Sequence, residues 1–350
     1  MKKSVYPSIS MQLSHSINHF DDNPALKEER NSCHWCRFRE WESNKLFPVS
    51  IVNRESEDTI DNNFEFIEKN IIGEGVELAD EDFQAGCECA SSFDCMKGGC
   101  YCLEDIDTSE REEGIRINAY HIVGRRKGCL RGEMLRSRMP IYECNKQCNC
   151  PETCPNKVVS RGRQIPLQIF RTVNRGWGKS IFTCTSPKRC LLTGSGLRST
   201  EDIMKGQFVG CYLGELITAE EANWRRAQST KSQKKDVYLF ALDKFTDPNS
   251  SDERLRGEPY EIDGEYFGGP TRFINHSCDP NLRIFAVVRD LANKPFHDLC
   301  FFALKEIPRF TELTFDYDGG VRGEEKAMDK MVEGMTRCLC GANNCRNWLW

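Results

Sequence analysis

Short runs of apolar residues, broken by Gly, Pro, Asn and Asp, recur along the chain from about residue 165 onward. Runs of this length and composition are typical of β-strands. One segment is helical instead, because Thr218 and Glu221 form a capping box ahead of residues 220–228. The pattern predicts a mostly β fold with few helices, and we expect strands within the following segments: 47–53, 166–170, 207–217, 237–242, 283–290 and 299–304.

Length, hydropathy and charge limit the class of protein. A chain of 350 residues, of which 39% are hydrophobic and 29% charged, can bury a substantial core in two or three domains. It has no run of 18 apolar residues and no apolar signal core, so we expect a protein that neither spans a membrane nor is secreted. The net charge of -5 argues against a protein that binds nucleic acid mainly through its phosphates, and it favours a basic partner.

Twenty cysteines predict that the protein binds metal, since clustered reduced cysteines most often hold metal. Three zinc ions need twelve ligand positions, which nine thiolates supply when six bind once and three bridge two metals. We therefore expect a three-zinc cluster, with two ordinary zinc sites and a spare thiol as the alternative. The nine cysteines lie in two dense groups: Cys87, Cys89, Cys95, Cys100 and Cys102, then Cys144, Cys148, Cys150 and Cys154.

Near the C-terminus, Cys338, Cys340 and Cys345 leave one position of a tetrahedral zinc site open. A water or substrate can take it, as in a catalytic zinc site, or a distant residue can close it. Cys278, isolated in the polar segment 272–281, is the candidate for closure. The remaining cysteines show no comparable framework, and several lie in apolar strands as small core residues: Cys33, Cys36, Cys129, Cys184, Cys190, Cys211 and Cys300.

The order of motifs resembles that of SET-domain lysine methyltransferases, with their pre-SET, SET and post-SET regions. The likeness is to compact fungal enzymes that trimethylate lysine 9 of histone H3, and it extends from about residue 31 to residue 350. After the nine-cysteine block come RGWG (175–178), YLGE (212–215), RFINHSCDPN (272–281), ELTFDY (312–317) and CLCGANNC (338–345).

The resemblance implies small curved sheets with a knot-like C-terminal segment, flanked by zinc-binding regions. It divides the chain into an N-terminal region (1–80), a pre-SET region (81–160), a SET domain (161–320) and a post-SET region (321–350). It also implies four zinc ions, three in the pre-SET cluster and one in the post-SET site.

The activity implied by the resemblance is methyl transfer from S-adenosylmethionine to a lysine ε-amine. Tyr317 is the implied catalytic residue, and Tyr212 and Phe315 line with it an aromatic channel that disfavours the charged amine. Phenylalanine at 315 implies trimethylation, although residues 312–317 taken alone would indicate a half-buried strand. The implied cofactor contacts are Gly176, Trp177, Gly178, Tyr238, Arg272, Asn275, His276 and Trp350.

The implied substrate is the histone H3 tail, paired as an extended strand beside residues 237–243. Residues 243–265 include eight acidic and three basic side chains, which suits a basic tail, but a solvated acidic loop explains them equally well. The resemblance further implies a nuclear, chromatin-bound protein in heterochromatin and gene silencing, brought there by partner proteins, without sequence-specific nucleic-acid contacts.

Two alternatives remain open from the sequence. One is a methyltransferase for another lysine, and the other is an inactive zinc-rich scaffold on chromatin. Intact Tyr317, Asn275 and His276 argue against the scaffold, since an inactive relative need not keep them.

Residues 179–196 depart from the family pattern. Their removal joins RGWG directly to LRSTEDI and restores that pattern. The codons at the two junctions can contain splice-donor and splice-acceptor sequences, and 18 codons correspond to 54 nucleotides, the length of a short intron. We therefore expect this insert to be an unspliced intron.

Overall fold

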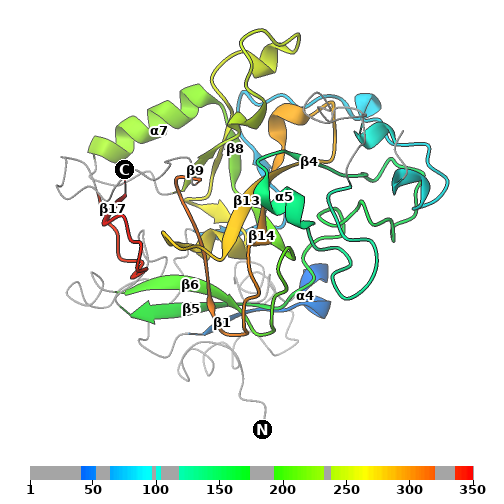
Figure 1. Ribbon diagram of the computed structural model, residues 1–350. Helices are drawn as coiled ribbons and strands as arrows, with labels where there is room; N and C mark the ends of the chain where they lie inside the picture. Colours follow the sequence, from blue (N-terminus) through cyan, green and yellow to red (C-terminus); the bar gives the residue numbers. More distant parts are fainter. Residues whose placement is uncertain are drawn as a thin grey trace, which may run out of the picture.

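Short strands are the main element of the computed structural model, as Figure 1 shows. In the part of the chain that the structure describes, they form one five-stranded sheet, two four-stranded sheets and two strand pairs. The predicted mostly β fold is therefore confirmed. The structure describes residues 41–52, 64–96, 100–103, 118–173, 193–231, 238–319 and 336–349.

The five-stranded sheet joins segments that lie far apart in the sequence. β12 pairs with β15 in parallel and sets His276 opposite Phe315, so two sequence motifs meet in one sheet. β6 pairs with β5 along its whole length. In sheet order, the strands are β1 (Val49–Val52), β5 (Leu167–Val173), β6 (Thr193–Ser199), β15 (Glu312–Phe315) and β12 (Asn275–His276).

The other sheets are smaller. The first four-stranded sheet has the order β3 (Ile71–Ile72), β8 (Glu215–Ile217), β10 (Glu261–Asp263) and β9 (Leu239–Ala241), which leaves β9 at an edge. The second has the order β4 (Ile141–Tyr142), β13 (Leu282–Val288), β14 (Asp298–Ala303) and β7 (Phe208–Tyr212). The strand pairs are β11 (Phe267–Gly268) with β2 (Glu65–Phe66), and β16 (Thr336–Arg337) with β17 (Trp348–Leu349).

The helix α7 (Ala219–Lys231) begins where the capping motif predicts. The backbone N–H of Glu221 donates to Oγ1 of Thr218 at 3.2 Å, which satisfies one of the free donors of the first turn. The carboxylate of Glu221 accepts from Arg225 rather than completing the reciprocal half of the capping box. The remaining helices are short: α4 (Glu42–Leu46), α5 (Gly132–Arg136) and the 3-10 turns η2 (Glu81–Phe83), η3 (Asp94–Met96), η4 (Tyr101–Leu103), η6 (Asp243–Phe245), η7 (Glu253–Leu255), η8 (Pro270–Phe273) and η9 (Lys294–Phe296).

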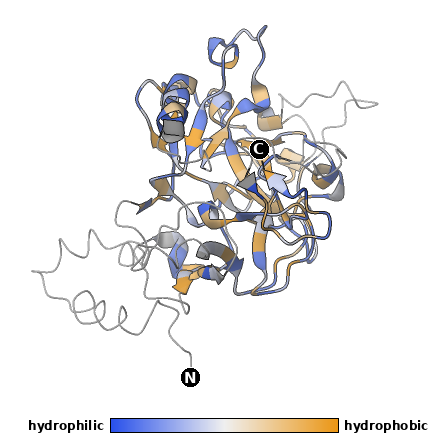
Figure 2. Cartoon of the chain, turned by 90° about the vertical axis from the view of Figure 1, so that its left-hand side faces the viewer, coloured by the Kyte–Doolittle hydropathy of each residue, from blue (hydrophilic) through white to orange (hydrophobic). Residues whose placement is uncertain are grey.

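Three buried clusters hold the sheets together, and Figure 2 shows hydrophobic residues in orange on the central strands. The main cluster takes alternate residues of β1 and β5, such as Ile51, Leu167 and Ile169, because successive side chains of a strand face opposite sides. The second cluster packs Met134 of α5 against Phe302 of β14. The third consists largely of cysteines between residues 87 and 154.

Each predicted strand segment contains a strand, but the segment 207–217 contains two. It breaks at Gly214, where a Cβ atom would lie 2.2 Å from the carbonyl oxygen of Asp263. The two-residue strands such as β4 and β12 were not predicted, because a pair of residues carries no periodicity. Among the described residues, no helix is long and apolar enough to cross a membrane.

Candidate active site and metal centres

Four aromatic side chains gather where β7, β9 and β15 end. The ring of Phe240 lies 4.6 Å from that of Tyr212, 5.7 Å from that of Phe315 and 6.5 Å from that of Tyr317, between ring centres. Phe315 and Tyr317 lie 4.7 Å apart. The structure thus brings together the three residues predicted for an aromatic channel, Tyr212, Phe315 and Tyr317, and adds Phe240, which the sequence presented only as part of a strand.

Tyr212 is fixed by its hydroxyl group, which donates to the carbonyl oxygen of Tyr238 at 2.8 Å. This position requires a glycine at 264, because a Cβ atom there would lie 2.4 Å from the hydroxyl oxygen. Burial raises the pKa of Tyr212 well above its usual value, so its phenol stays neutral.

Tyr317 is held at both its backbone and its side chain. Its hydroxyl donates to the carbonyl oxygen of Ile274 at 3.1 Å, and its backbone N–H donates to Nδ1 of His276 at 3.2 Å. Burial raises the pKa of Tyr317 far above the usual value for a phenol. A tyrosine in this environment is a hydrogen-bonding group and not a base at neutral pH.

His276 joins Tyr317 to the C-terminal cysteines. Since Nδ1 accepts a hydrogen bond from Tyr317, the network assigns the ring proton to Nε2, which faces Sγ of Cys278 at 3.3 Å. Burial lowers the pKa of His276 to about 4, so the ring is neutral at physiological pH.

Cys278 does lie with the three C-terminal cysteines. The sulfur atoms of Cys278, Cys338, Cys340 and Cys345 are all within 4.8 Å of one another, a group that can hold a metal ion. Backbone N–H groups of Arg346 and Asn347 donate to Sγ of Cys278 and Cys345, each at 3.4 Å, as N–H groups commonly do around metal-bound thiolates.

The charge state of this group suits a cation. Although burial opposes it, backbone hydrogen bonds from Cys278 and Ala342 lower the pKa of Cys340 to about 7. Burial raises the pKa of Cys278. A divalent cation among the four sulfurs allows all of them to ionise, since metal binding displaces thiol protons.

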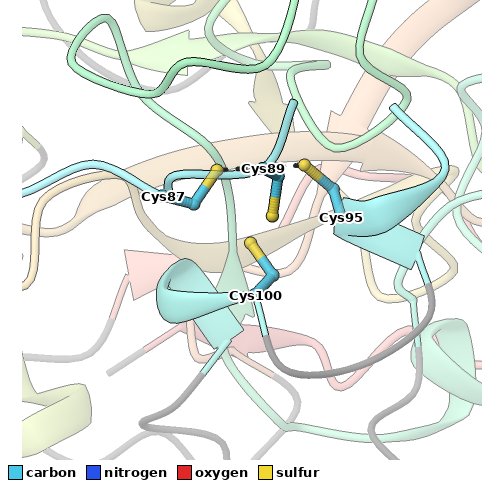
Figure 3. A group of neighbouring side chains, drawn as sticks. All are labelled: Cys87, Cys89, Cys95 and Cys100. Carbon is cyan, nitrogen blue, oxygen red and sulfur yellow. Dashed lines mark hydrogen bonds between the residues drawn. The ribbon is translucent and has the colours of Figure 1, made fainter. Parts of the chain in front are cut away.

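The nine cysteines between residues 87 and 154 form one continuous cluster. Four overlapping sets of four sulfurs, each set within 4.8 Å, together include all nine. Figure 3 shows one set, in which four cysteines turn their sulfurs toward a common space: Cys87 and Cys89 from one segment, Cys95 from η3, and Cys100 from just before η4. Cys87 and Cys144 each belong to three of the four sets, which is the sharing that bridging thiolates require.

The sulfur spacing fits zinc. Two thiolates bound to one tetrahedral zinc at about 2.3 Å lie about 3.8 Å apart. Sγ of Cys95 lies 3.8 Å from Sγ of Cys87 and 3.8 Å from Sγ of Cys144. Cys102 and Cys148 lie closer, at 3.3 Å.

Burial raises the pKa of Cys150 to about 12, so its thiolate needs positive charge nearby. Both metal groups predicted from spacing are thus able to hold metal, and all thirteen predicted ligands lie in them.

The predicted cofactor contacts among the described residues lie beside the aromatic group. The Arg272 guanidinium stacks 3.9 Å from the ring centre of Tyr238, and its Nε donates to the carbonyl oxygen of Gly264 at 2.9 Å. The Asn275 amide donates to the carbonyl oxygen of Ser195 at 2.8 Å and to the carboxylate of Glu312 at 2.7 Å. The other predicted contacts, Gly176, Trp177, Gly178 and Trp350, lie outside the described residues, as do Cys33, Cys36, Cys184 and Cys190.

Arg346 and Asp316 are functional candidates that the sequence did not single out. The guanidinium of Arg346 binds both carboxylate oxygens of Asp316, at 2.6 and 3.1 Å, and one oxygen of Asp318 at 3.2 Å. Asp316 directly precedes Tyr317, so this fork ties the C-terminal cysteine segment to the residue next to the channel. The available signal was that Asp316 lies within ELTFDY and that Arg346 directly follows CLCGANNC.

Half of the eight acidic side chains in the segment 243–265 form ion pairs within the described part of the chain. Asp263 and Glu261 bind Arg225 and Arg226 of α7. Asp252 binds Arg254. The composition of this segment therefore overstates the negative charge that it offers to a partner.

The class of protein is defined by two family models. The pre-SET motif matches residues 41–157, and the SET domain matches residues 194–318. The pre-SET match includes the nine-cysteine cluster, and the SET match includes the four side chains of the aromatic group.

Individual relatives cover nearly the whole chain. A Neurospora crassa protein named "Histone-lysine N-methyltransferase, H3 lysine-9 specific dim-5" is 49% identical over 96% of this chain and 98% of its own. The solved structure of Neurospora DIM-5 has a TM-score of 0.67 and 50% identity, covering 84% of this chain and all of that one.

A structure of SUVH6 from Arabidopsis thaliana in complex with SAM has a TM-score of 0.60 and 26% identity, covering 91% of this chain and 59% of that one. The chain belongs to the SET-domain family of histone-lysine N-methyltransferases, as the order of its motifs indicated.

Proposed function

We propose that the protein transfers methyl groups from S-adenosylmethionine to lysine 9 of histone H3, up to the trimethyl state. The observation that supports this proposal most strongly is the aromatic group around Phe315, next to a neutral, hydrogen-bonded Tyr317. Relatives at 48 and 49% identity are named as specific for this lysine. The enzyme would act on nuclear chromatin, in heterochromatin and gene silencing, with partner proteins directing it there.

The substrate tail is proposed to pair with β9. This strand forms one edge of its sheet among the described residues, so its outer backbone groups can accept an added strand. β9 carries Phe240 into the aromatic group, so a peptide paired there would run past the channel. A lysine of that peptide can then enter between Tyr212, Phe315 and Tyr317.

The aromatic group assists the loss of the lysine proton. An ammonium ion is disfavoured in apolar surroundings, which lowers the lysine pKa and supplies the free amine. Because Tyr317 commits its proton to Ile274, its hydroxyl oxygen presents lone pairs to the channel and can orient the amine. Phe315 has no hydroxyl with which to hold a water beside the amine, so room remains for a second and a third methyl group.

S-adenosylmethionine supplies an electrophilic methyl group on its sulfonium. We propose that it is held by Tyr238, Arg272, Asn275 and His276 together with Gly176, Trp177, Gly178 and Trp350. Asn275 and His276 lie on β12 directly beside β15, so cofactor and channel residues share one sheet.

We propose four zinc ions, three in the nine-cysteine cluster and one in the C-terminal group. Overlap among the pre-SET sets supports bridging thiolates. The C-terminal zinc would fix Cys278, and through His276 it would fix the backbone of Tyr317. Within this proposal the catalytic domain at 161–320 lies between metal regions at 81–160 and 321–350.

Residues 179–196 are proposed to be a retained intron. Their last residues lie in β6, where a Cβ atom at Gly196 would lie 2.9 Å from both the Glu312 carboxylate and the Phe170 ring. Without the insert, Gly178 would directly precede Leu197 and would supply the glycine that this position needs. The Asn275 amide donates to the backbone carbonyl oxygen of Ser195, and any residue that takes this position would supply the same acceptor. Sequencing the cDNA tests the proposal, since a main transcript that keeps the 54 nucleotides contradicts it.

The substrate proposal is tested with labelled S-adenosylmethionine and H3 tail peptides in which each lysine is replaced in turn by arginine. We expect transfer to every peptide except the one without lysine 9. Transfer that survives the loss of lysine 9 would refute the substrate assignment and favour another lysine. No transfer to any peptide, from protein with full zinc content, would favour the inactive scaffold.

A further inference from the structure

Two cysteines outside the metal groups face each other across neighbouring strands. Cys211 of β7 and Cys300 of β14 are register partners in an antiparallel pair, and their sulfurs lie 3.2 Å apart. Neither belongs to a set of side chains able to hold a metal in the described part of the chain. The sequence indicated only ordinary core residues at these positions.

Their geometry is that of a disulfide in its reduced form. Directly opposed residues of an antiparallel pair have Cα atoms roughly 4.5 to 5.5 Å apart, inside the range of roughly 4.4 to 6.8 Å found for disulfides. The sulfurs need to approach by about 1.2 Å to reach the bonded length of about 2.05 Å. Small side-chain rotations and a slight movement of one strand supply that approach.

The two thiols differ in access. Cys300 is fully buried, whereas Cys211 is partly exposed. Burial, together with the neighbouring thiol, raises the pKa of Cys300 well above its usual value. An oxidant therefore meets Cys211 first, and Cys300 is placed to react second.

We propose that Cys211 and Cys300 form a reversible disulfide when a peroxide oxidises the protein. The Cys211 thiolate attacks one peroxide oxygen, which breaks the O–O bond and gives a sulfenic acid and hydroxide, and the hydroxide takes up the proton that the thiol released and becomes water. The Cys300 thiol then attacks that sulfur, forms the S–S bond and releases a second water. In total, two thiols and one hydrogen peroxide give one disulfide and two waters.

The crosslink would shift residues of the aromatic channel, because each cysteine precedes a residue that either belongs to the channel or packs against it. Tyr212 follows Cys211 and contacts Phe240 at 4.6 Å. Phe301 follows Cys300 and lies 4.9 Å from Phe315. Movements well below 1 Å at these rings disturb a near-attack geometry, so we expect the oxidised protein to have kcat lowered about fivefold or more.

The test uses the zinc-loaded full chain treated with one equivalent of hydrogen peroxide. Nonreducing peptide mapping, zinc release and methyl transfer are measured before and after reduction with dithiothreitol. We expect a Cys211–Cys300 peptide, unchanged zinc content, and a loss of kcat that the reductant reverses. The peptide map does not depend on which lysine is the substrate, so its failure is distinct from failure of the proposed function.

Variants separate this disulfide from damage to the metal clusters. Cys211→Ser and Cys300→Ala should keep the activity of the reduced protein and lose its peroxide sensitivity. Cys129→Ser, at a buried cysteine outside the metal groups, should remain as sensitive as the unmodified chain. Zinc release without a Cys211–Cys300 peptide would overturn the proposal. Peroxide sensitivity of the Cys211→Ser and Cys300→Ala variants equal to that of the unmodified chain would also overturn it.

Discussion

At the scale of single residues, the site depends on keeping polar side chains neutral. Burial raises the pKa of Tyr317 and lowers that of His276, so neither carries charge at physiological pH. The hydrogen bond from the Tyr317 backbone to Nδ1 of His276 requires that neutral ring. Besides the sulfonium of the cofactor, the cation expected at the channel is then the substrate lysine, and the apolar aromatic rings favour loss of its proton.

Phe315→Tyr should shift the product from trimethyl toward mono- and dimethyl lysine. A hydroxyl at this position would hold a water or bond to the amine and occupy space that the later methyl groups need. Product mass spectrometry on an H3 tail peptide measures the shift. Phe310→Tyr is the matched control, because Phe310 is 52% exposed and its ring lies against the guanidinium of Arg198. An unchanged trimethyl yield in Phe315→Tyr would show that Phe315 does not set the product.

Because His297 is buried, we predict that the folded protein loses stability in acid. Burial lowers its pKa to about 4, below the value of about 6.5 for an exposed histidine. The unfolded chain therefore binds more protons between these pH values, so stability present above pH 6.5 falls as the pH drops toward 4. The full effect is about 3 kcal/mol.

Urea unfolding at several pH values measures this effect as the difference between the unmodified chain and His297→Asn. Acid loss of zinc and titration of His276 are common to both proteins. The variant should have the shallower dependence below pH 6.5. Parallel curves would show that His297 is not buried as described.

At the scale of elements, much of the fold was predictable and the site was predictable in part. The helix α7 and strands such as β13 and β14 were visible because each spans enough residues to show a period. The Cys278 site was predictable because three cysteines left one ligand position open. Phe240 was not, since nothing in an apolar strand shows which ring meets a channel until β9, β7 and β15 converge.

The contact between the C-terminal segment and β15 gives a prediction at this scale. Arg346 holds Asp316 through two hydrogen bonds, each worth roughly 1.5 to 3 kcal/mol when charged groups are involved. Arg346→Ala should lower kcat/KM about tenfold or more, because each 1.4 kcal/mol is a factor of ten. Arg346→Lys should restore only part of the lost kcat/KM, since lysine lacks the planar guanidinium that binds both carboxylate oxygens of Asp316.

Arg337→Ala is the control for this measurement, because Arg337 is exposed on β16 of the same segment. Zinc content should stay the same in all three variants, which separates positioning from loss of the metal site. Full activity in Arg346→Ala would contradict the positioning role.

At the scale of the whole molecule, two groups of cysteines that are able to hold metal add to the hydrophobic clusters that join the sheets. The pre-SET cluster is a buried core made of sulfur, and the C-terminal group reaches the channel through His276. The proposed insert at 179–196 was visible as an interruption of the family pattern after RGWG and through the splice sequences that the codons at its two junctions can contain.

The zinc content of the purified chain should be four per molecule by elemental analysis. Cys278→Ser should lower it by about one and abolish methylation, because the C-terminal segment loses its anchor beside His276. Cys129→Ser should keep both. A count of two or fewer would contradict the three-zinc cluster, and activity retained by Cys278→Ser would separate the metal from the active site.

The central claim is that this chain trimethylates lysine 9 of histone H3. The most direct test is fragmentation mass spectrometry of intact H3 after incubation with S-adenosylmethionine and the zinc-loaded chain, with Tyr317→Phe as the inactive control. We predict three methyl groups on lysine 9 and none above background elsewhere. Methyl groups on another lysine, or product that stops at one methyl group, would contradict the account.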